Sequence, residues 1–218
     1  MTMNNRRVSL ADYVFARLEE EILNEDYKPG QTLTEMAVSE QMQVSRTPVR
    51  EAFRRLQQEG YLVEAGKGSI VAGTTPRDMM DIYEIRMRTE GLAARWAAER
   101  VTDGDLAEIR DAIDLQEFYT AKGKAGHIQE QDANFHRLVF QYCGSPILSD
   151  MLSALHRRIQ RYRRHSVENR IRAVRAVEEH RAIYEALLAR DPDAAERLAL
   201  QHVKNAKEHM GTEETSWV

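Results

Sequence analysis

Apolar positions near the start of the chain recur with the period of an α-helix. They follow Ser9, a residue type that caps helices, and fall at Leu10, Val14, Leu18 and Ile22. The pattern stops at a Lys-Pro-Gly turn. Thr34 and Ser45 are placed to cap two further short helices, one through Met42 and one to about Gln58. The sequence therefore predicts three helices within its first sixty residues.

The spacing of apolar positions changes to that of a β-strand after Glu59-Gly60. Residues 61–65 and 69–72 alternate between apolar and polar types, and Gly66-Lys67-Gly68 stands between them as a turn. This pattern predicts a β-hairpin directly after the three helices. No alternating segment of this kind follows, so the remainder of the chain is expected to be helical.

A second domain is expected to begin at Thr75. The run Thr-Pro-Arg-Asp combines a capping residue, a proline suited to the first helical position and an acidic residue that completes a capping box. From there the apolar positions predict six or seven helices. The expected fold is mainly α, with a three-helix unit and its β wing over 1–74, an all-helical bundle over 75–210, and an aperiodic tail over 211–218.

Composition places the chain among globular proteins. Of its 218 residues 30% are charged and 42% hydrophobic, and no apolar run approaches the roughly 20 residues that span a bilayer. The single cysteine, Cys143, cannot form an intramolecular disulfide, which favours a reducing compartment. We therefore expect a cytoplasmic protein with no membrane partner.

Net charge at first argues against a nucleic-acid partner, because a chain of charge −4 lacks the basic footprint of phosphate binding. The distribution of charge changes this picture. Residues 1–75 hold 9 Lys and Arg against 11 Asp and Glu, whereas residues 41–68 hold 5 against 3, a local net charge of +2. A weak basic patch therefore coincides with the third predicted helix.

The third predicted helix has one apolar and one basic face. Its apolar positions are Val49, Phe53 and Leu56, and the arginines on the other side are Arg46, Arg50 and Arg54. A guanidinium grips phosphate oxygens or pairs with guanine in the major groove, and the Thr47 hydroxyl adds a contact. An ordinary solvated surface helix explains the arginines equally well. The order of short helix, turn, second helix and hairpin favours a winged helix-turn-helix, whose second helix enters the major groove.

Residues 30–73 closely resemble the GntR family of transcription regulators. The likeness rests on Gly30, Leu33, Glu35, SRTPVREAF at 45–53, Leu56, Glu59-Gly60 and the Gly-x-Gly wing. Val38-Ser39 and Gln43 depart from the family pattern, in which Leu-Ala and a turn glycine are usual. Neither departure removes a DNA contact.

The resemblance implies that the start of the third helix faces DNA and that the wing meets the adjacent backbone and minor groove. The expected DNA-contacting set is Arg46, Thr47, Arg50, Arg54, Lys67 and Gly68. A single helix contacts few base pairs, and two-fold symmetry doubles the site. The expected partner is therefore a short palindromic operator in double-stranded DNA, bound by a homodimer.

Four polar residues in the second half fall on otherwise apolar helical faces. They are Asp132, His136, His180 and His202. A lone inward histidine is usually a hydrogen-bonded core residue, but burying three with a carboxylate is costly unless they share a partner such as a metal ion. Asp132 and His136 are four residues apart, so both reach one ion from successive helical turns. Nitrogen-rich ligands favour zinc, nickel or manganese over calcium.

The same segments resemble the FCD domain, the C-terminal half of the FadR-type subfamily of GntR regulators. The likeness rests on DANFH at 132–136, EEHRAIYEAL at 178–187 and the region of His202, and it covers roughly residues 78–210. It implies that Asp132, His136, His180 and His202 are the metal ligands. Histidines 127, 156, 165 and 209 match no family ligand and are left outside the predicted site.

Arg86 lies in line with Ile82 and Ala93 on the first helix of the second domain, and a buried guanidinium needs an anion. Glu90 or Glu179 is one candidate partner, and a ligand carboxylate is the other. The FCD resemblance places this arginine at the effector cavity and favours the ligand. The arginines between residues 157 and 164 are expected to form a mainly solvated face, with one or two of them lining the effector pocket.

These patterns together predict a sequence-specific DNA-binding regulator, a repressor whose DNA affinity is controlled by a small carboxylate bound next to a divalent metal. Two alternatives remain open. The helical half can be a dimerisation module with a structural metal, or it can hold a catalytic zinc for hydrolysis. The chain has no HExxH motif and no evident general base after the ligands, so we do not expect an enzyme.

Overall fold

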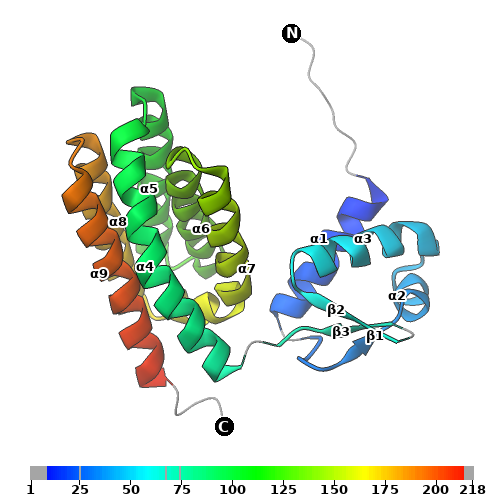
Figure 1. Ribbon diagram of the computed structural model, residues 1–218. Coiled ribbons are helices and arrows are strands. Elements are labelled where there is room, and N and C mark those ends of the chain that lie inside the picture. Colours follow the sequence, from blue (N-terminus) through cyan, green and yellow to red (C-terminus); the bar gives the residue numbers. More distant parts are fainter. Residues whose placement is uncertain (1–8, 25, 67, 74, 214–218) are drawn as a thin grey trace. The chain divides into compact units, whose positions relative to one another are not determined.

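The structure is a computed structural model, and it describes residues 9–24, 26–66, 68–73 and 75–213 (Figure 1). The chain separates into two compact units, with the division between Thr74 and Thr75. Among the described residues, no helix is long and apolar enough to cross a membrane.

The described residues of the first unit form three helices and three short strands. In chain order they are α1 (Leu10–Leu23), β1 (Thr32–Leu33), α2 (Glu35–Met42), α3 (Arg46–Gln58), β2 (Leu62–Ala65) and β3 (Gly68–Val71). Ser9 and Thr34 cap α1 and α2 by accepting hydrogen bonds from the backbone, as predicted. Ser45 occupies the N-cap position of α3, but its side chain makes no capping hydrogen bond.

The core of the first unit comes from the apolar stripes that the sequence shows. Val14, Leu18 and Ile22 of α1 pack with Val49 and Leu56 of α3, and all five are fully buried. The turn between α2 and α3 runs through Gln43, whose φ of 53° is left-handed and costs a non-glycine residue about 1 kcal/mol. Gln43 therefore adopts the left-handed conformation that a turn glycine adopts more easily, and it does so at a cost in free energy.

The strand β1 is absent from the sequence prediction, which expected only a hairpin. The observed sheet has the order β1-β3-β2, with both pairs antiparallel, and Thr32 lies opposite Ile70. A strand of two residues has no periodicity to detect. The third strand also explains Gly68, because a Cβ there would lie 2.5 Å from the Leu33 carbonyl oxygen.

The second unit consists, over its described residues, of six helices. They are α4 (Pro76–Arg100), α5 (Asp103–Lys122), α6 (Ala125–Tyr142), α7 (Pro146–Glu168), α8 (Arg170–Leu188) and α9 (Pro192–Glu213). Complete capping boxes begin α4 at Thr75 and α5 at Thr102. The last helix extends to Glu213 and so includes the first three residues of the predicted tail. Residues 214–218 of that tail lie outside the described part of the chain.

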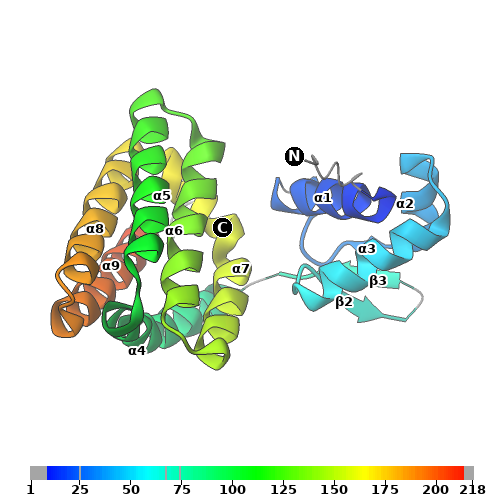
Figure 2. The same ribbon diagram turned by 90° about the horizontal axis from the view of Figure 1, so that it is seen from above.

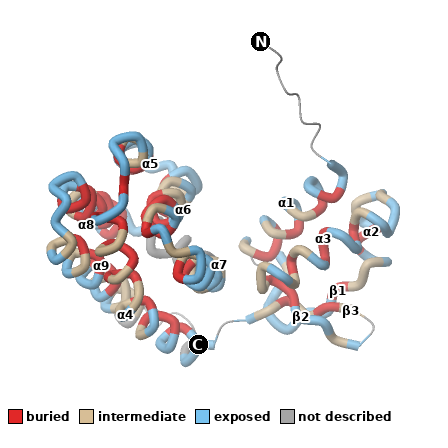
Figure 3. Tube along the Cα trace, turned by 45° about the horizontal axis from the view of Figure 1, so that its top comes forward, coloured by how far each residue is buried: buried red, intermediate tan, exposed pale blue. Residues whose placement is uncertain are grey.

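The six helices form a bundle whose buried faces point inward (Figures 2 and 3). Its main apolar cluster combines α4, α5, α6, α8 and α9. Helix α4 packs against α6, α7, α8 and α9, and a Cβ on Gly91 would lie only 3.1 Å from the backbone oxygen of Glu196 on α9. Side chains on the inner face of α4 therefore reach the centre of the bundle.

Candidate functional sites

The exposed face of α3 carries the arginines that the sequence assigns to DNA. Arg46, Thr47, Arg50 and Arg54 are all exposed, while Val49 and Phe53 are buried beneath them. Arg55, on the same helix, behaves differently because its Nη1 donates a 2.6 Å hydrogen bond to Asp12 of α1. Arg46, Arg50 and Arg54, one from each of three consecutive turns, thus face solvent on the same side of α3. Lys67, the predicted wing contact, lies outside the described residues.

Glu35, the first residue of α2, holds two of these arginines. Its carboxylate accepts hydrogen bonds from Arg50 Nε at 3.2 Å and lies 3.5 Å from Arg46 Nη2. Both arginine side chains remain more than half exposed. The pairing orients the arginines across the turn of the helix-turn-helix and leaves their outer edges open to a phosphate or a base.

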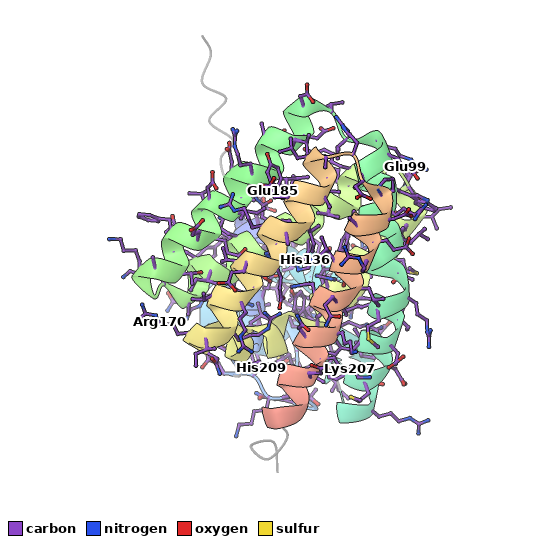
Figure 4. All side chains as sticks on the ribbon, turned by 90° about the vertical axis from the view of Figure 1, so that its left-hand side faces the viewer. Glu99, His136, Arg170, Glu185, Lys207 and His209 are labelled. Atoms are coloured by element: carbon purple, nitrogen blue, oxygen red, sulfur yellow. The ribbon has the colours of Figure 1, made fainter. Side chains whose placement is uncertain are left out.

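The buried histidines of the second unit converge as predicted. His136 of α6, His180 of α8 and His202 of α9 offer ring nitrogens that all lie within 4.8 Å of one another. The rings are at most 4% exposed. Asp132 Oδ1 is 3.8 Å from His180 Nε2, so the fourth predicted residue lies beside the cluster. Figure 4 places His136 behind α8 and α9, inside the bundle.

Each of the three imidazoles turns its Nδ1 toward an outer partner. His180 Nδ1 donates to Gln116 Oε1 at 2.8 Å, and His202 Nδ1 donates to Glu179 Oε2 at 2.7 Å. His136 Nδ1 lies 3.5 Å from Glu90 Oε2. Such partners fix the tautomer, so that Nε2 carries the lone pair. Three nitrogen donors with a carboxylate beside them are a donor set that suits zinc or nickel.

His156 of α7 belongs to the same buried region, although the sequence interpretation left it out. Its Nε2 lies 2.7 Å from Glu90 Oε1, and Glu90, His136 and His156 form a second close group of potential ligand atoms. Helical spacing contained the signal, because His156 stands four residues after Leu152 and three before Ile159, both fully buried. Gln116 was missed as well, since an amide on an apolar face gives no motif.

Arg86 pairs with Glu90, which was one of its candidate partners. The pair is buried, and Arg86 Nε donates to Glu90 Oε1. Burial alone would raise the pKa of Glu90, but the charges of Arg86 and His156 hold it well below its usual range. The terminal nitrogens of Arg86, Nη1 and Nη2, are buried and have no hydrogen-bond partner in the described structure. Burial would lower the pKa of Arg86, but the charge of Glu90 raises it. Asp132 is close enough for its charge to add a smaller contribution in the same direction.

Comparison with known proteins agrees with both halves of this architecture. The model of the bacterial regulatory proteins, gntR family, matches residues 10–71, and the FCD domain model matches residues 81–205. The chain belongs to the GntR family and carries an FCD domain. The Nta operon transcriptional regulator of Aminobacter aminovorans is 30% identical over 82% of this chain and 83% of its own length. The galactonate operon transcriptional repressor of Escherichia coli is 28% identical over 94% of this chain and 96% of its own.

Solved structures show the same fold. E. coli McbR/YncC superposes with a TM-score of 0.78 at 25% identity, covering 95% of this chain and all of that one. A GntR regulator from Rhodococcus sp. RHA1 gives a TM-score of 0.73 at 21% identity, over 92% and 96% of the two chains. This GntR protein is therefore a DNA-binding transcriptional regulator with a winged helix-turn-helix and a helical FCD domain. Its relatives are regulators rather than enzymes, which leaves no support for the hydrolase alternative.

Proposed function

We propose that this GntR regulator is a repressor that binds a palindromic operator as a homodimer and is released by a small carboxylate. The carboxylate binds in the FCD domain between Arg86 and a divalent metal. The observation that carries this proposal is the free edge of Arg86 in the middle of the bundle.

The free edge of Arg86 has the geometry of a carboxylate receptor. Glu90 occupies Nε, so Nη1 and Nη2 are left side by side, and neither has a hydrogen-bond partner among the described residues. Two parallel N–H groups match the two oxygens of a carboxylate. Leaving a buried donor unsatisfied costs about 1 to 3 kcal/mol, and a ligand that accepts both hydrogen bonds removes that cost. An anion therefore gains more from this site than a neutral analogue.

The metal is the second anchor in this proposal. Asp132, His136, His180 and His202 would hold it, with zinc or nickel preferred and manganese as a further candidate. A bound divalent cation supplies positive charge that a carboxylate oxygen can coordinate. The ring orientations set by Gln116, Glu179 and Glu90 support the assignment of Nε2 as the donor atom.

Metal binding is tested on full-length protein purified without an affinity tag. We expect one divalent ion per chain by elemental analysis, and its loss in a His180→Ala, His202→Ala double variant. A metal-free protein that resists reconstitution would contradict the metal assignment, and so would a double variant that still holds the ion.

Effector binding is tested by calorimetry with a panel of hydroxy, sugar and dicarboxylic acids and their neutral amides. We expect the acids to bind and Arg86→Gln to abolish the binding. Arg88→Gln is the matched control, because Arg88 lies on the same helix with its side chain 77% exposed. Equal binding of acids and amides would exclude Arg86 as the anchor.

Regulation is tested by titrating the tightest-binding acid in the presence and absence of operator DNA. With a regulatory coupling of about 1 to 3 kcal/mol, operator DNA lowers the affinity for the acid 5- to 150-fold, and the acid lowers the affinity for operator DNA by the same factor. If the acid binds equally well with and without operator, the FCD domain is a dimerisation module and its pocket is not a switch.

A further inference from the structure

A polar pocket lies between the first half of α8 and the last half of α9. Its volume is about 620 Å³, and its wall includes the arginines Arg172 and Arg175 together with the carboxylates Glu178, Glu179 and Glu208. Asn205 and His209 of α9 also line it. Figure 4 looks onto this side of the bundle, with Arg170 at the start of α8 and His209 on α9. Arg86 and the proposed metal ligands are not among the residues of its wall. The pocket is therefore distinct from the proposed effector site.

Arg172 is a buried arginine in this wall whose hydrogen bonding is incomplete. Its side chain is only 8% exposed, and Nη2 donates to Glu179 Oε2 at 3.0 Å. Its Nε and Nη1 are buried without a hydrogen-bond partner in the described structure. The backbone around it is fixed, because the Asn169 side chain caps the start of α8 by accepting from Ile171 N and Arg172 N. A buried guanidinium with unused donors calls for an acceptor.

Glu179 cannot satisfy Arg172 alone, because three groups share this carboxylate. Oε2 accepts from both Arg172 Nη2 and His202 Nδ1, and Oε1 accepts from Asn205 Nδ2 at 2.8 Å. Arg172 and His202 therefore compete for one oxygen. Any ligand that draws Arg172 toward the pocket leaves Glu179 more fully to His202.

We propose that the α8–α9 pocket binds an oxyanion, the carboxylate or phosphate group of a small polar ligand, through Arg172. Occupancy of the pocket is communicated to His202 through Glu179. The first statement is independent of the proposed function, whereas the second rests on His202 being a metal ligand. A carboxylate that accepts less from Arg172 is a stronger acceptor for His202 Nδ1, which makes Nε2 the better donor.

The oxyanion site is tested by calorimetric titration of the full-length protein with inorganic phosphate and, separately, with acetate. We expect saturable binding of at least one probe, with Arg172→Gln weakening it at least tenfold. Binding that is lost in Arg172→Gln and kept in folded Arg86→Gln belongs to this site, whereas acetate binding that is lost in Arg86→Gln belongs to the proposed effector site. Tighter phosphate binding would assign phosphate-bearing ligands, and tighter acetate binding would assign carboxylates.

Two variants keep this test decisive. Arg170→Gln changes an exposed arginine two residues away that does not line the pocket, and should leave the affinity unchanged. Arg175→Glu reverses the charge of an exposed wall residue and should weaken binding even if Arg172→Gln fails to fold. The site is wrong if the wild type binds neither probe, or if folded Arg172→Gln and Arg175→Glu proteins bind like the wild type.

The link to His202 is tested by chelator competition for zinc with and without phosphate. We expect phosphate to tighten zinc binding several-fold in the wild type and in Arg170→Gln, but not in Arg172→Gln. An equal effect of phosphate in Arg172→Gln would overturn the link, because it would come from phosphate and zinc in solution. If the chain holds no zinc at all, the proposed metal and this link both fail, while the phosphate titration still decides the oxyanion site.

Discussion

Each unit of this regulator pairs arginine with glutamate, but in opposite environments. On the surface of the first unit, Arg50 and Glu35 have side chains that are 58% and 26% exposed. Inside the second unit, Arg86 and Glu90 are 1% and 4% exposed. The residue types are the same, and only their contact with water differs.

This difference in solvent contact suits each pair to a different ligand. An exposed pair is worth about 0 to 1 kcal/mol, so a DNA phosphate can replace Glu35 at little cost. In the buried pair Glu90 contacts both Arg86 and His156. Removing one partner of such a buried pair costs about 3 to 5 kcal/mol in the free energy of unfolding. In the proposed function Arg86 therefore stays in place, and the effector would have to enter the bundle to reach Nη1 and Nη2, which have no hydrogen-bond partner among the described residues. The surface pair therefore suits a partner that replaces Glu35 reversibly, and the buried pair suits a ligand that is chosen by its size and charge.

The largest effect is expected from breaking the buried pair. Glu90→Leu leaves the Arg86 charge buried and unpaired, so we expect a loss of about 3 to 5 kcal/mol in the free energy of unfolding. Urea unfolding followed by circular dichroism measures it. Glu99→Leu, on the same helix but in an exposed pair with Arg95, is the control and should cost little. A Glu90→Leu protein as stable as the control would remove the distinction between the two pairs.

The next effect concerns the partners of the histidines. Gln116→Leu removes the acceptor of His180 Nδ1, and the loss of such an outer contact typically weakens metal binding 10- to 100-fold, about 1.4 to 2.7 kcal/mol. Chelator competition with zinc measures the change. Arg181→Gln, next to His180 but paired with Asp114 and Glu117 at the outside of the bundle, is expected to bind zinc normally. Equal zinc affinity in both variants would mean that Gln116 does not orient the ligand.

Breaking the exposed arginine face should affect DNA and not folding. Arg50→Ala is expected to cost about 1 to 3 kcal/mol of operator affinity and to relax the preference for one base. Fluorescence anisotropy with operator variants measures both. Arg55→Ala is the matched control on α3, because its side chain points to Asp12 and not to solvent on the basic face. Unchanged operator affinity in an Arg46→Ala, Arg50→Ala double variant would exclude α3 as the recognition helix.

The smallest effect is expected at Glu35 itself. Glu35→Gln removes the charge that two exposed arginines share, and we expect a change in stability below about 1 kcal/mol. Affinity for non-operator DNA should rise slightly, because Arg46 and Arg50 no longer have to break an ion pair with Glu35 before they bind a DNA phosphate. Thermal unfolding and titration with random-sequence DNA check the two expectations. A stability loss as large as that of Glu90→Leu would show that exposure is not what separates the pairs.

Much of this protein could be predicted from local patterns in its sequence. Thr34, Thr75 and Thr102 begin helices where the chain predicts them, because a cap depends only on residues three positions away. The basic face of α3 and the inward turn of His136, His180 and His202 follow from helical periodicity in the same way. Resemblance to a known family supplied the roles of these residues.

The tertiary structure decided the features that join distant parts of the chain. The strand β1 exists because β3 pairs with it, and Gly68 is required because the Leu33 backbone lies against it. His156 meets Glu90 across 66 residues, and Glu179 joins His202 to Arg172 at the edge of a pocket. Sequence periodicity fixes which side of a helix is buried, whereas the neighbour on that side depends on how separate helices pack. For this reason the sequence determined which side chains point into the bundle, and the fold decided which of them meet.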